Sequence, residues 1–152
     1  MKSIHLNGLL ICCILYLPSV AQLTIPITRQ TQEKSLLFTP LSEKTSISIV
    51  TLEGLFDGRS SGEVRIPLAD HNQLEGTILE KVVKSATLET INIRLLNYSG
   101  GLFTLSKIKT SDLSFSYAGR IVSRAHGDVL VLTRVKDKYF LVKQKQSLYL
   151  VE

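Results

Sequence analysis

Apolar and polar residues alternate with a period of two through the second half of the chain, from residue 88 to residue 152. In the first segment Ile91, Ile93 and Leu95 fall on one face, and the residues between them are polar. This spacing is typical of a strand with one buried and one solvated face. The pattern predicts an antiparallel meander. Its later strands, each separated by turn residues, are expected at 102–109, 113–117, 128–135, 138–143 and 147–151.

Two further strands are predicted earlier in the chain. Residues 46–52 alternate and are followed by Glu53 and Gly54, so we expect the first firm strand there. Residues 63–68 alternate as well, but Pro67 lacks the N–H that a strand ladder needs. This second strand should therefore lie at an edge of the sheet or end at the proline.

Residues 74–86 fit either a helix or a strand. Apolar positions that include Leu74, Ile78 and Val82 form the stripe of an amphipathic helix. Gly76 and several β-branched residues oppose a helix, and strands are predicted on both sides. We favour a strand, because natural sequences usually have local preferences that agree with the surrounding fold.

Two features indicate how the sheet is shaped. Gly119 interrupts a strand, as a β-bulge or the sharp bend of a closing sheet requires. Tyr139 and Phe140 are consecutive, so they must point to opposite faces of their strand. The sequence therefore predicts an all-β, single-domain protein, an antiparallel meander that forms a curved sheet, small barrel or sandwich of about eight strands.

Residues 1–21 have the features of a secretory signal peptide. Lys2 is followed by an uncharged apolar run, and Ser19 and Ala21 are the small residues that a signal peptidase requires. A membrane anchor is the alternative, but the run is shorter than the roughly 20 residues that span a bilayer, and Pro18 interrupts it. We expect cleavage after Ala21 and an exported protein, periplasmic or extracellular, with no transmembrane segment.

Cleavage at this site would remove both cysteines, Cys12 and Cys13. The mature chain could then form no disulfide, and an apolar core would have to stabilise it. A chain of about 130 residues is long enough for one such domain. Residues 22–44 have no sustained period and contain two prolines, so we predict an extended or mobile leader there. The β domain would comprise residues 45–152.

The chain carries a formal net charge of +5, with most of the excess near its C-terminus. A basic surface can bind nucleic acid, anionic lipid or acidic polysaccharide. Lysine and arginine on exposed strands also discourage edge-to-edge pairing, and we favour this interpretation and expect no nucleic-acid partner. The basic residues concerned are Arg120, Arg124, Arg134, Lys136, Lys138, Lys143 and Lys145.

Two turns of the mature chain contain a histidine close to a carboxylate. Asp70 and His71 lie in one turn, and His126 and Asp128 lie in the other. If the turns met, these four residues could bind a divalent metal ion, or pair a general base with the group that orients it. The same residue types are also common in tight turns for conformational reasons. We therefore predict no metal site, and keep the four residues as the candidates to test.

Other catalytic signatures are missing from the sequence. It contains no Gly-x-Ser-x-Gly, no His-Glu-x-x-His and no phosphate-binding Gly-x-x-x-x-Gly-Lys. We therefore predict no catalytic residue and no cofactor. A row of exposed rings could bind sugars or single-stranded nucleic acid, although core packing accounts for most aromatic residues in strands. Those residues are Phe103, Phe115, Tyr117, Tyr139, Phe140 and Tyr149.

Four segments carry a resemblance to known proteins, at residues 91–94, 98–107, 117–123 and 126–128. They look like segments of short, uncharacterised exported β-rich proteins of Gram-negative bacteria. More distantly, they resemble the N-terminal prodomains of secreted zinc metallopeptidases. The second resemblance implies a chaperone-like or inhibitory partner of a secreted peptidase. Because no peptidase domain follows residue 152, we expect such a protein to act in trans.

These observations favour a non-enzymatic binding or envelope-associated protein, whose partner is another exported protein or an anionic surface. Two alternatives stay open: a prodomain-like modulator of a secreted peptidase, and a small hydrolase or metal-dependent enzyme built on His71 and His126. A pocket with convergent polar groups around these histidines would favour the enzyme. An exposed patch or an open strand edge would favour binding.

Overall fold

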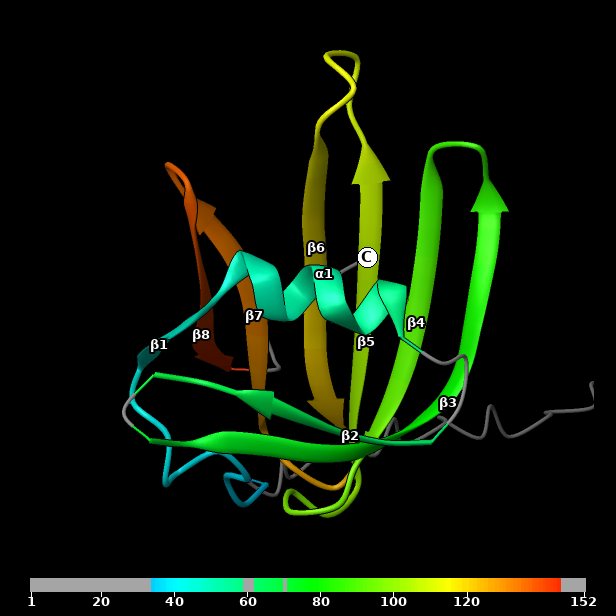
Figure 1. Cartoon of the computed structure of the whole chain (residues 1–152). Helices are drawn as coiled ribbons and strands as arrows, with labels where there is room; N and C mark the ends of the chain where they lie inside the picture. Colours follow the sequence, from blue (N-terminus) through cyan, green and yellow to red (C-terminus); the bar gives the residue numbers. More distant parts are fainter. Residues whose placement is uncertain (1–33, 59–61, 70, 146–152) are drawn as a thin grey trace, which may run out of the picture. The chain divides into compact units, whose positions relative to one another are not determined.

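Eight strands and one short helix form the described part of the chain, and they are shown in the computed structural model of Figure 1. The structure describes residues 34–58, 62–69 and 71–145, all of which belong to one compact unit. The predicted signal peptide and the strand predicted at 147–151 lie outside these residues. The elements are β1 (Lys44–Ile47), α1 (Ile49–Asp57), β2 (Gly62–Pro67), β3 (Gln73–Ser85), β4 (Leu88–Leu95), β5 (Gly101–Lys109), β6 (Phe115–Ser123), β7 (Asp128–Val135) and β8 (Lys138–Lys145).

The strands form one antiparallel sheet in the order β1-β8-β7-β6-β5-β4-β3-β2. Strands β2 to β8 are a meander, and β1 pairs with β8 at the far edge. The prediction of an all-β antiparallel meander of about eight strands is confirmed. The strand that contains Pro67 is indeed an edge strand, and residues 73–85 form a strand and not a helix.

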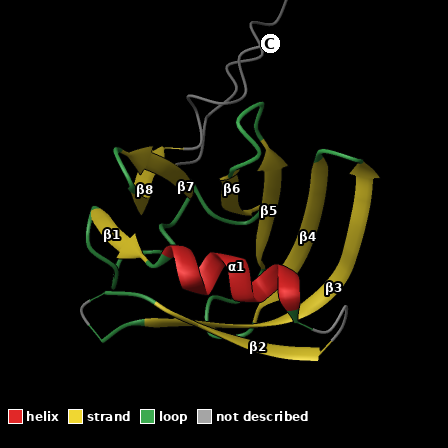
Figure 2. Cartoon of the chain, turned by 45° about the horizontal axis from the view of Figure 1, so that its top comes forward, coloured by secondary structure: helices red, strands yellow, loops and turns green. Residues whose placement is uncertain are grey.

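The sheet curls into a half-barrel, because β3 bends sharply. Its register against β4 shifts between Ile78 and Glu80, as at a β-bulge. The first part of β3 runs with β2 across one end of the sheet, and the second part runs alongside β4 (Figures 1 and 2). After β2, the Ala69 N–H donates to the Ser46 carbonyl of β1 at 3.0 Å. This bond joins the two edges, and we call this the closed end.

The opposite end, where the β3–β4 and β5–β6 hairpins project beyond α1, is the open end (Figure 1). Helix α1 crosses the concave side of the sheet (Figure 2). This helix corrects the strand predicted at 46–52, which stops at Ile47. The Ser48 hydroxyl accepts a hydrogen bond from the Val50 N–H and caps the helix. Leu52 and Phe56, four residues apart, are both buried against the sheet side.

The core lies between α1 and the concave face of the sheet, where the inward residue of each strand meets its neighbours. It is apolar, as the sequence predicted. Its largest fully buried side chains are Tyr139, Phe38, Phe103, Leu52, Ile66, Leu74, Ile91, Ile93, Leu105, Ile121, Leu130 and Leu141.

Of the two features expected at Gly119, a β-bulge or a sharp bend, the bulge is not present. Gly119 pairs in continuous register with Leu105 on one side and Leu132 on the other. A Cβ at this position would lie 2.8 Å from the Thr104 carbonyl oxygen, so glycine is needed for close packing of neighbouring strands.

The last part of the segment predicted as a leader packs on the closed end. Phe38 and Leu41 are buried in the core. The Asp128 carboxylate, itself buried at the start of β7, accepts hydrogen bonds from the Leu37 and Phe38 N–H groups, each at 2.8 Å. The Phe38 ring also packs against that of Tyr98 in a tilted arrangement, with the ring centroids 5.5 Å apart. These contacts attach the described residues before β1 to the half-barrel.

Candidate functional site

A groove of about 180 Å³ lies at the open end, where the β3–β4 hairpin meets β5 and β6. Its walls combine apolar side chains with two lysines and one glutamate. The lining residues are Val83, Ser85, Ala86, Thr87, Leu88, Glu89, Lys107, Lys109 and Phe115.

The register of the sheet places the charged lining residues on the concave face. Val83 pairs with Glu89, and Glu89 pairs with Lys107 across the next ladder. Directly paired residues of an antiparallel ladder share one face of the sheet. Lys107 lies two residues from Leu105, which is fully buried in the core. The groove therefore lies on the same concave face as the core, in the part of that face that projects beyond α1 and carries polar residues.

Lys107 is the most unusual residue of the groove. Its side chain is half-buried, and its Nζ lies 4.4 Å from the ring centroid of Phe115 and 5.8 Å from that of Phe56. Both contacts are of the cation–π type, which favours a desolvated ammonium group. In the described part of the chain, Lys107 has no carboxylate oxygen within 4.0 Å. An ammonium group in this position can accept an anion from outside the protein.

The glutamate of the groove, by contrast, has its own counter-ion. Lys81 Nζ lies 3.3 Å from the Glu89 carboxylate, and both side chains are largely buried. The same Lys81 ammonium donates to the Phe56 carbonyl at the C-terminal end of α1. A cation at a helix C-terminus is stabilised by the helix dipole. Lys81 therefore neutralises Glu89 and attaches α1 to β3, which leaves Lys107 and Lys109 as the uncompensated charges of the groove.

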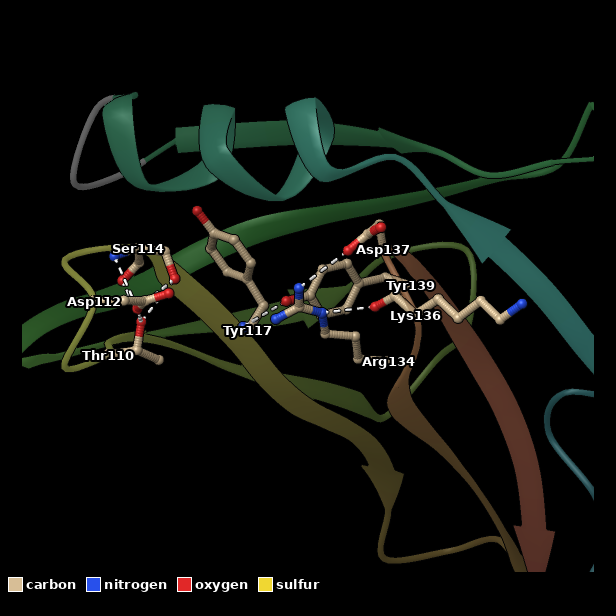
Figure 3. Close-up of polar contacts among 8 residues, drawn as sticks. All are labelled: Thr110, Asp112, Ser114, Tyr117, Arg134, Lys136, Asp137 and Tyr139. Carbon is tan, nitrogen blue, oxygen red and sulfur yellow. Dashed lines mark hydrogen bonds and ion pairs between the residues drawn. The ribbon is translucent and has the colours of Figure 1, made fainter.

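Tyr117 lies beside Lys107 on the next strand, with its hydroxyl pointing towards α1 (Figure 3). The side chain is buried, and its hydroxyl has no hydrogen-bond partner among the described residues. Burial, with smaller contributions from Glu53, Tyr139 and Asp57, raises the pKa of Tyr117 to about 12. The phenol is thus held in its neutral form.

The Tyr139 hydroxyl accepts a backbone hydrogen bond at the point where β6 and β7 separate. The β6–β7 ladder covers only residues 119–122 of β6, so the strands separate towards the open end. There the Tyr117 N–H donates to the Tyr139 hydroxyl at 3.1 Å (Figure 3). A buried side-chain oxygen thus replaces the carbonyl that a longer ladder would have supplied.

The tip of the β5–β6 hairpin is held by a polar network around Asp112 (Figure 3). The Asp112 carboxylate accepts hydrogen bonds from the Thr110 hydroxyl and from the Ser114 hydroxyl and N–H. These bonds lower the pKa of Asp112 below its usual value, and the bond from Thr110 has the largest effect. Leu113, inside this network, has a φ of 64° and is 72% exposed.

Three of the four candidate metal ligands lie in the described part of the chain, and each has different contacts. His71 is exposed in the β2–β3 turn with a φ of 59°, and Asp70 lies outside the described residues. The His126 Nδ1 lies 2.9 Å from the Ser123 hydroxyl, and Asp128 binds the backbone before β1. Over the described ranges, no group of three or more His, Cys, Asp or Glu side chains could hold a metal ion.

The basic residues near the C-terminus mostly face solvent. Arg134 pairs with Asp137 at 3.4 Å and donates to the Lys136 carbonyl (Figure 3). Lys143 lies 3.5 Å from the Glu43 carboxylate. The groove lysines, in contrast, lie earlier in the chain.

Lys107 and Lys109 were not predicted as site residues. A signal is present in β5, since Phe103, Leu105, Lys107 and Lys109 share the inward face of the strand. A lysine on an inward face is rare unless it is paired or has a function. The alternation of residues thus points to Lys107, but its two aromatic neighbours come from α1 and β6 and depend on the tertiary fold.

In the part of the chain that the structure describes, no helix has the length and apolar character needed to cross a membrane. Comparisons with protein-family models, with curated proteins and with solved structures find no match to this chain.

Proposed function

We propose that the protein is an exported, non-enzymatic binding module whose groove at the open end holds an amphipathic anion. The observation that carries this proposal is the half-buried Lys107 ammonium, which lies close to two aromatic rings and, among the described residues, has no carboxylate oxygen within 4.0 Å. An anionic group bound there would supply the missing counter-charge. Lys109, which also lines the groove, would provide a second cation.

The apolar walls determine what kind of anion fits. Val83 and Phe115 are 71% and 43% exposed, so part of their surface is available to an alkyl or aromatic portion of the ligand. The groove, at about 180 Å³, is smaller than the 300 Å³ or more of typical small-molecule pockets. It suits a head group with the first part of a chain better than a complete large ligand.

The enzyme alternative has less support. Asp128 is engaged by two backbone N–H groups, and His126 by a serine hydroxyl. His71 is exposed in a different turn. The predicted signal at residues 1–21 supports a location in the periplasm or outside the cell, where a binding module of this kind would act.

Isothermal titration of the exported protein with dodecanoate, below its micellar concentration, tests the proposal. Dodecyltrimethylammonium has the same alkyl chain with a cationic head group and serves as the control ligand. We expect saturable binding of dodecanoate, and no binding of the cation. Lys107→Met should weaken dodecanoate binding about tenfold, because a hydrogen bond to a charged group is lost.

Lys138→Met is the matched control variant, since Lys138 is an exposed lysine of β8 that does not line the groove. Its affinity for dodecanoate should equal that of the wild type. Equal binding of both ligands, or equal affinity of the Lys107→Met protein and the wild type, would contradict the proposal. Thermal melting of each variant establishes that the fold is intact.

A further inference from the structure

The open end carries exposed apolar side chains on two separate hairpins. Val83 in β3, Leu113 in the β5–β6 turn and Phe115 in β6 are 71%, 72% and 43% exposed. The two hairpins project at the same end of the sheet, beyond α1 (Figure 1). Large apolar side chains gathered at one end of a protein are typical of a contact surface.

Leu113 adds a second indication. Its φ of 64° places a bulky side chain in the left-handed region, which favours glycine or asparagine and strains a leucine. The turn is not loose, because Asp112 binds Thr110 and Ser114 around it. Strained residues held by a well-bonded turn are more frequent at functional sites than elsewhere. The turn thus presents an apolar side chain at a position where a polar residue would fit with less strain.

Lysines surround these apolar positions. Lys84 lies next to Val83 and is exposed, and Lys107 and Lys109 line the groove. Cations exceed carboxylates near the tips of these two hairpins, and Glu89 is already neutralised by Lys81. The charged residues concerned are Lys81, Lys84, Lys107 and Lys109 against Glu89 and Asp112.

We propose that the open end docks on an anionic phospholipid bilayer. Leu113, Val83 and Phe115 would enter the boundary between head groups and acyl chains, and the lysines would face the lipid phosphates. Apolar side chains surrounded by lysines are the combination that binds peripherally to anionic membranes, where burial and charge attraction act together. A protein partner would more often offer one continuous apolar patch, whereas these residues lie on separate hairpins with charges between them.

Co-sedimentation of the exported protein with vesicles tests this inference. One set contains phosphatidylcholine alone, and the other contains phosphatidylcholine with phosphatidylglycerol at about three to one. We expect binding only to the anionic vesicles, and a strong reduction in 0.5 M salt, which screens the charges. Leu113→Asn should reduce the bound fraction at least about fivefold, because the apolar side chain is lost.

Asparagine tolerates the left-handed conformation, so Leu113→Asn should melt at or above the wild-type temperature. Leu96→Asn is the matched control, because Leu96 is also exposed but lies in the β4–β5 turn at the other end of the sheet. Its vesicle binding should equal that of the wild type. The inference would be overturned by equal binding to both vesicle types, or by equal losses in the two variants.

The groove and the docking surface can be tested separately. Leu113→Asn should leave the affinity for dodecanoate unchanged, since Leu113 does not line the groove. A protein that fails to bind dodecanoate but binds anionic vesicles would contradict the proposed function alone. The remaining outcome is a dimer that forms in solution without vesicles and dissociates on Leu113→Asn, in a protein that binds no vesicles. This outcome would identify a second copy as the occupant and overturn the membrane inference.

Discussion

Tyr117 and Tyr139 contact each other as an edge-to-face pair, with ring centroids 5.7 Å apart, but their hydroxyl groups have opposite roles. The Tyr139 hydroxyl satisfies the Tyr117 N–H, whereas the Tyr117 hydroxyl has no partner in the described part of the chain. Removal of a hydroxyl should therefore have different consequences at the two positions, even though both side chains are buried.

Tyr139→Phe should lower the free energy of unfolding by about 1–3 kcal/mol, because a buried N–H loses its acceptor. Tyr117→Phe should change it by less than about 0.5 kcal/mol or raise it, because an unpaired buried hydroxyl is replaced by hydrogen. Urea unfolding of the two variants measures both values. Similar losses in both variants would show that the Tyr139 hydroxyl is not a needed acceptor.

The raised pKa of Tyr117 predicts how alkaline pH affects stability. Its pKa is about 12 in the folded protein and 10.0 at its ordinary value, so the unfolded chain releases this proton first. The contribution of Tyr117 to stability is present below pH 10 and is lost as the pH rises from 10 to 12. Urea midpoints measured between pH 9 and 12 should therefore decline less steeply for Tyr117→Phe than for the wild type.

Part of the slope should remain in that variant, because burial also raises the pKa of Tyr98. Tyr98→Phe is accordingly a useful second comparison. If the decline between pH 10 and 12 were identical with and without the Tyr117 hydroxyl, the phenol would not be held neutral by its surroundings.

The helix and the strands of this fold should respond in opposite ways to the same substitution. Gly54 is exposed in α1, and a Cβ there would meet no atom of the described residues within 4 Å. Gly54→Ala should raise the free energy of unfolding by about 0.5–1 kcal/mol, since alanine has the higher helix propensity. Gly119→Ala should lower it by about 1–3 kcal/mol, because the added Cβ would lie 2.8 Å from the Thr104 carbonyl oxygen. Thermal or urea unfolding of the two variants shows whether each substitution raises or lowers the free energy of unfolding.

The strands could be predicted from the sequence because each has one face on a common core. Alternation identified β4 and β7 with nearly the bounds that the structure shows. Residues 73–85 were harder, since β-branched and apolar residues there fit two periods, and the bulge near Leu79 disturbs the alternation.

Helix α1 could not be predicted in the same way. Ile47 continues into Ile49 with the spacing of a strand, and only the turn at Ser48 changes the direction of the chain. The helical spacing of Leu52, Leu55 and Phe56 is brief, and the helix is stabilised by the concave face that it covers. That face is assembled from residues far away in the sequence, so local preference does not decide the outcome. The groove depends on the same assembly, because Phe56 and Phe115 reach Lys107 only once α1 lies across the sheet.

The closed end of the half-barrel contains contacts that stabilise the fold, and the open end contains the proposed binding surfaces. The closed end is joined by the Ala69 to Ser46 hydrogen bond and covered by the buried Phe38. The open end carries the groove and the exposed hairpin tips. A change at the closed end should therefore alter the free energy of unfolding without altering what the groove binds.

Asp128 is the residue at which this separation can be tested. Asp128→Ala should lower the free energy of unfolding by about 2–4 kcal/mol, because the N–H groups of Leu37 and Phe38 would both lose their acceptor. Proteases should then cleave the chain between residues 34 and 43 more rapidly. The affinity for dodecanoate should stay at the wild-type value in the folded fraction, measured under conditions where the variant remains folded.

Asp137→Ala supplies the control, since its carboxylate is 96% exposed and its contact with Arg134 is solvated. That variant should differ from the wild type by less than about 0.5 kcal/mol. The competing hypothesis, in which Asp128 ligates a metal ion together with His126, His71 and Asp70, makes a different prediction. It requires added zinc to raise the melting temperature of the wild type and not that of Asp128→Ala. Because both Asp128 oxygens already accept backbone hydrogen bonds, we expect zinc to change neither, and a zinc-dependent increase confined to the wild type would refute the structural role.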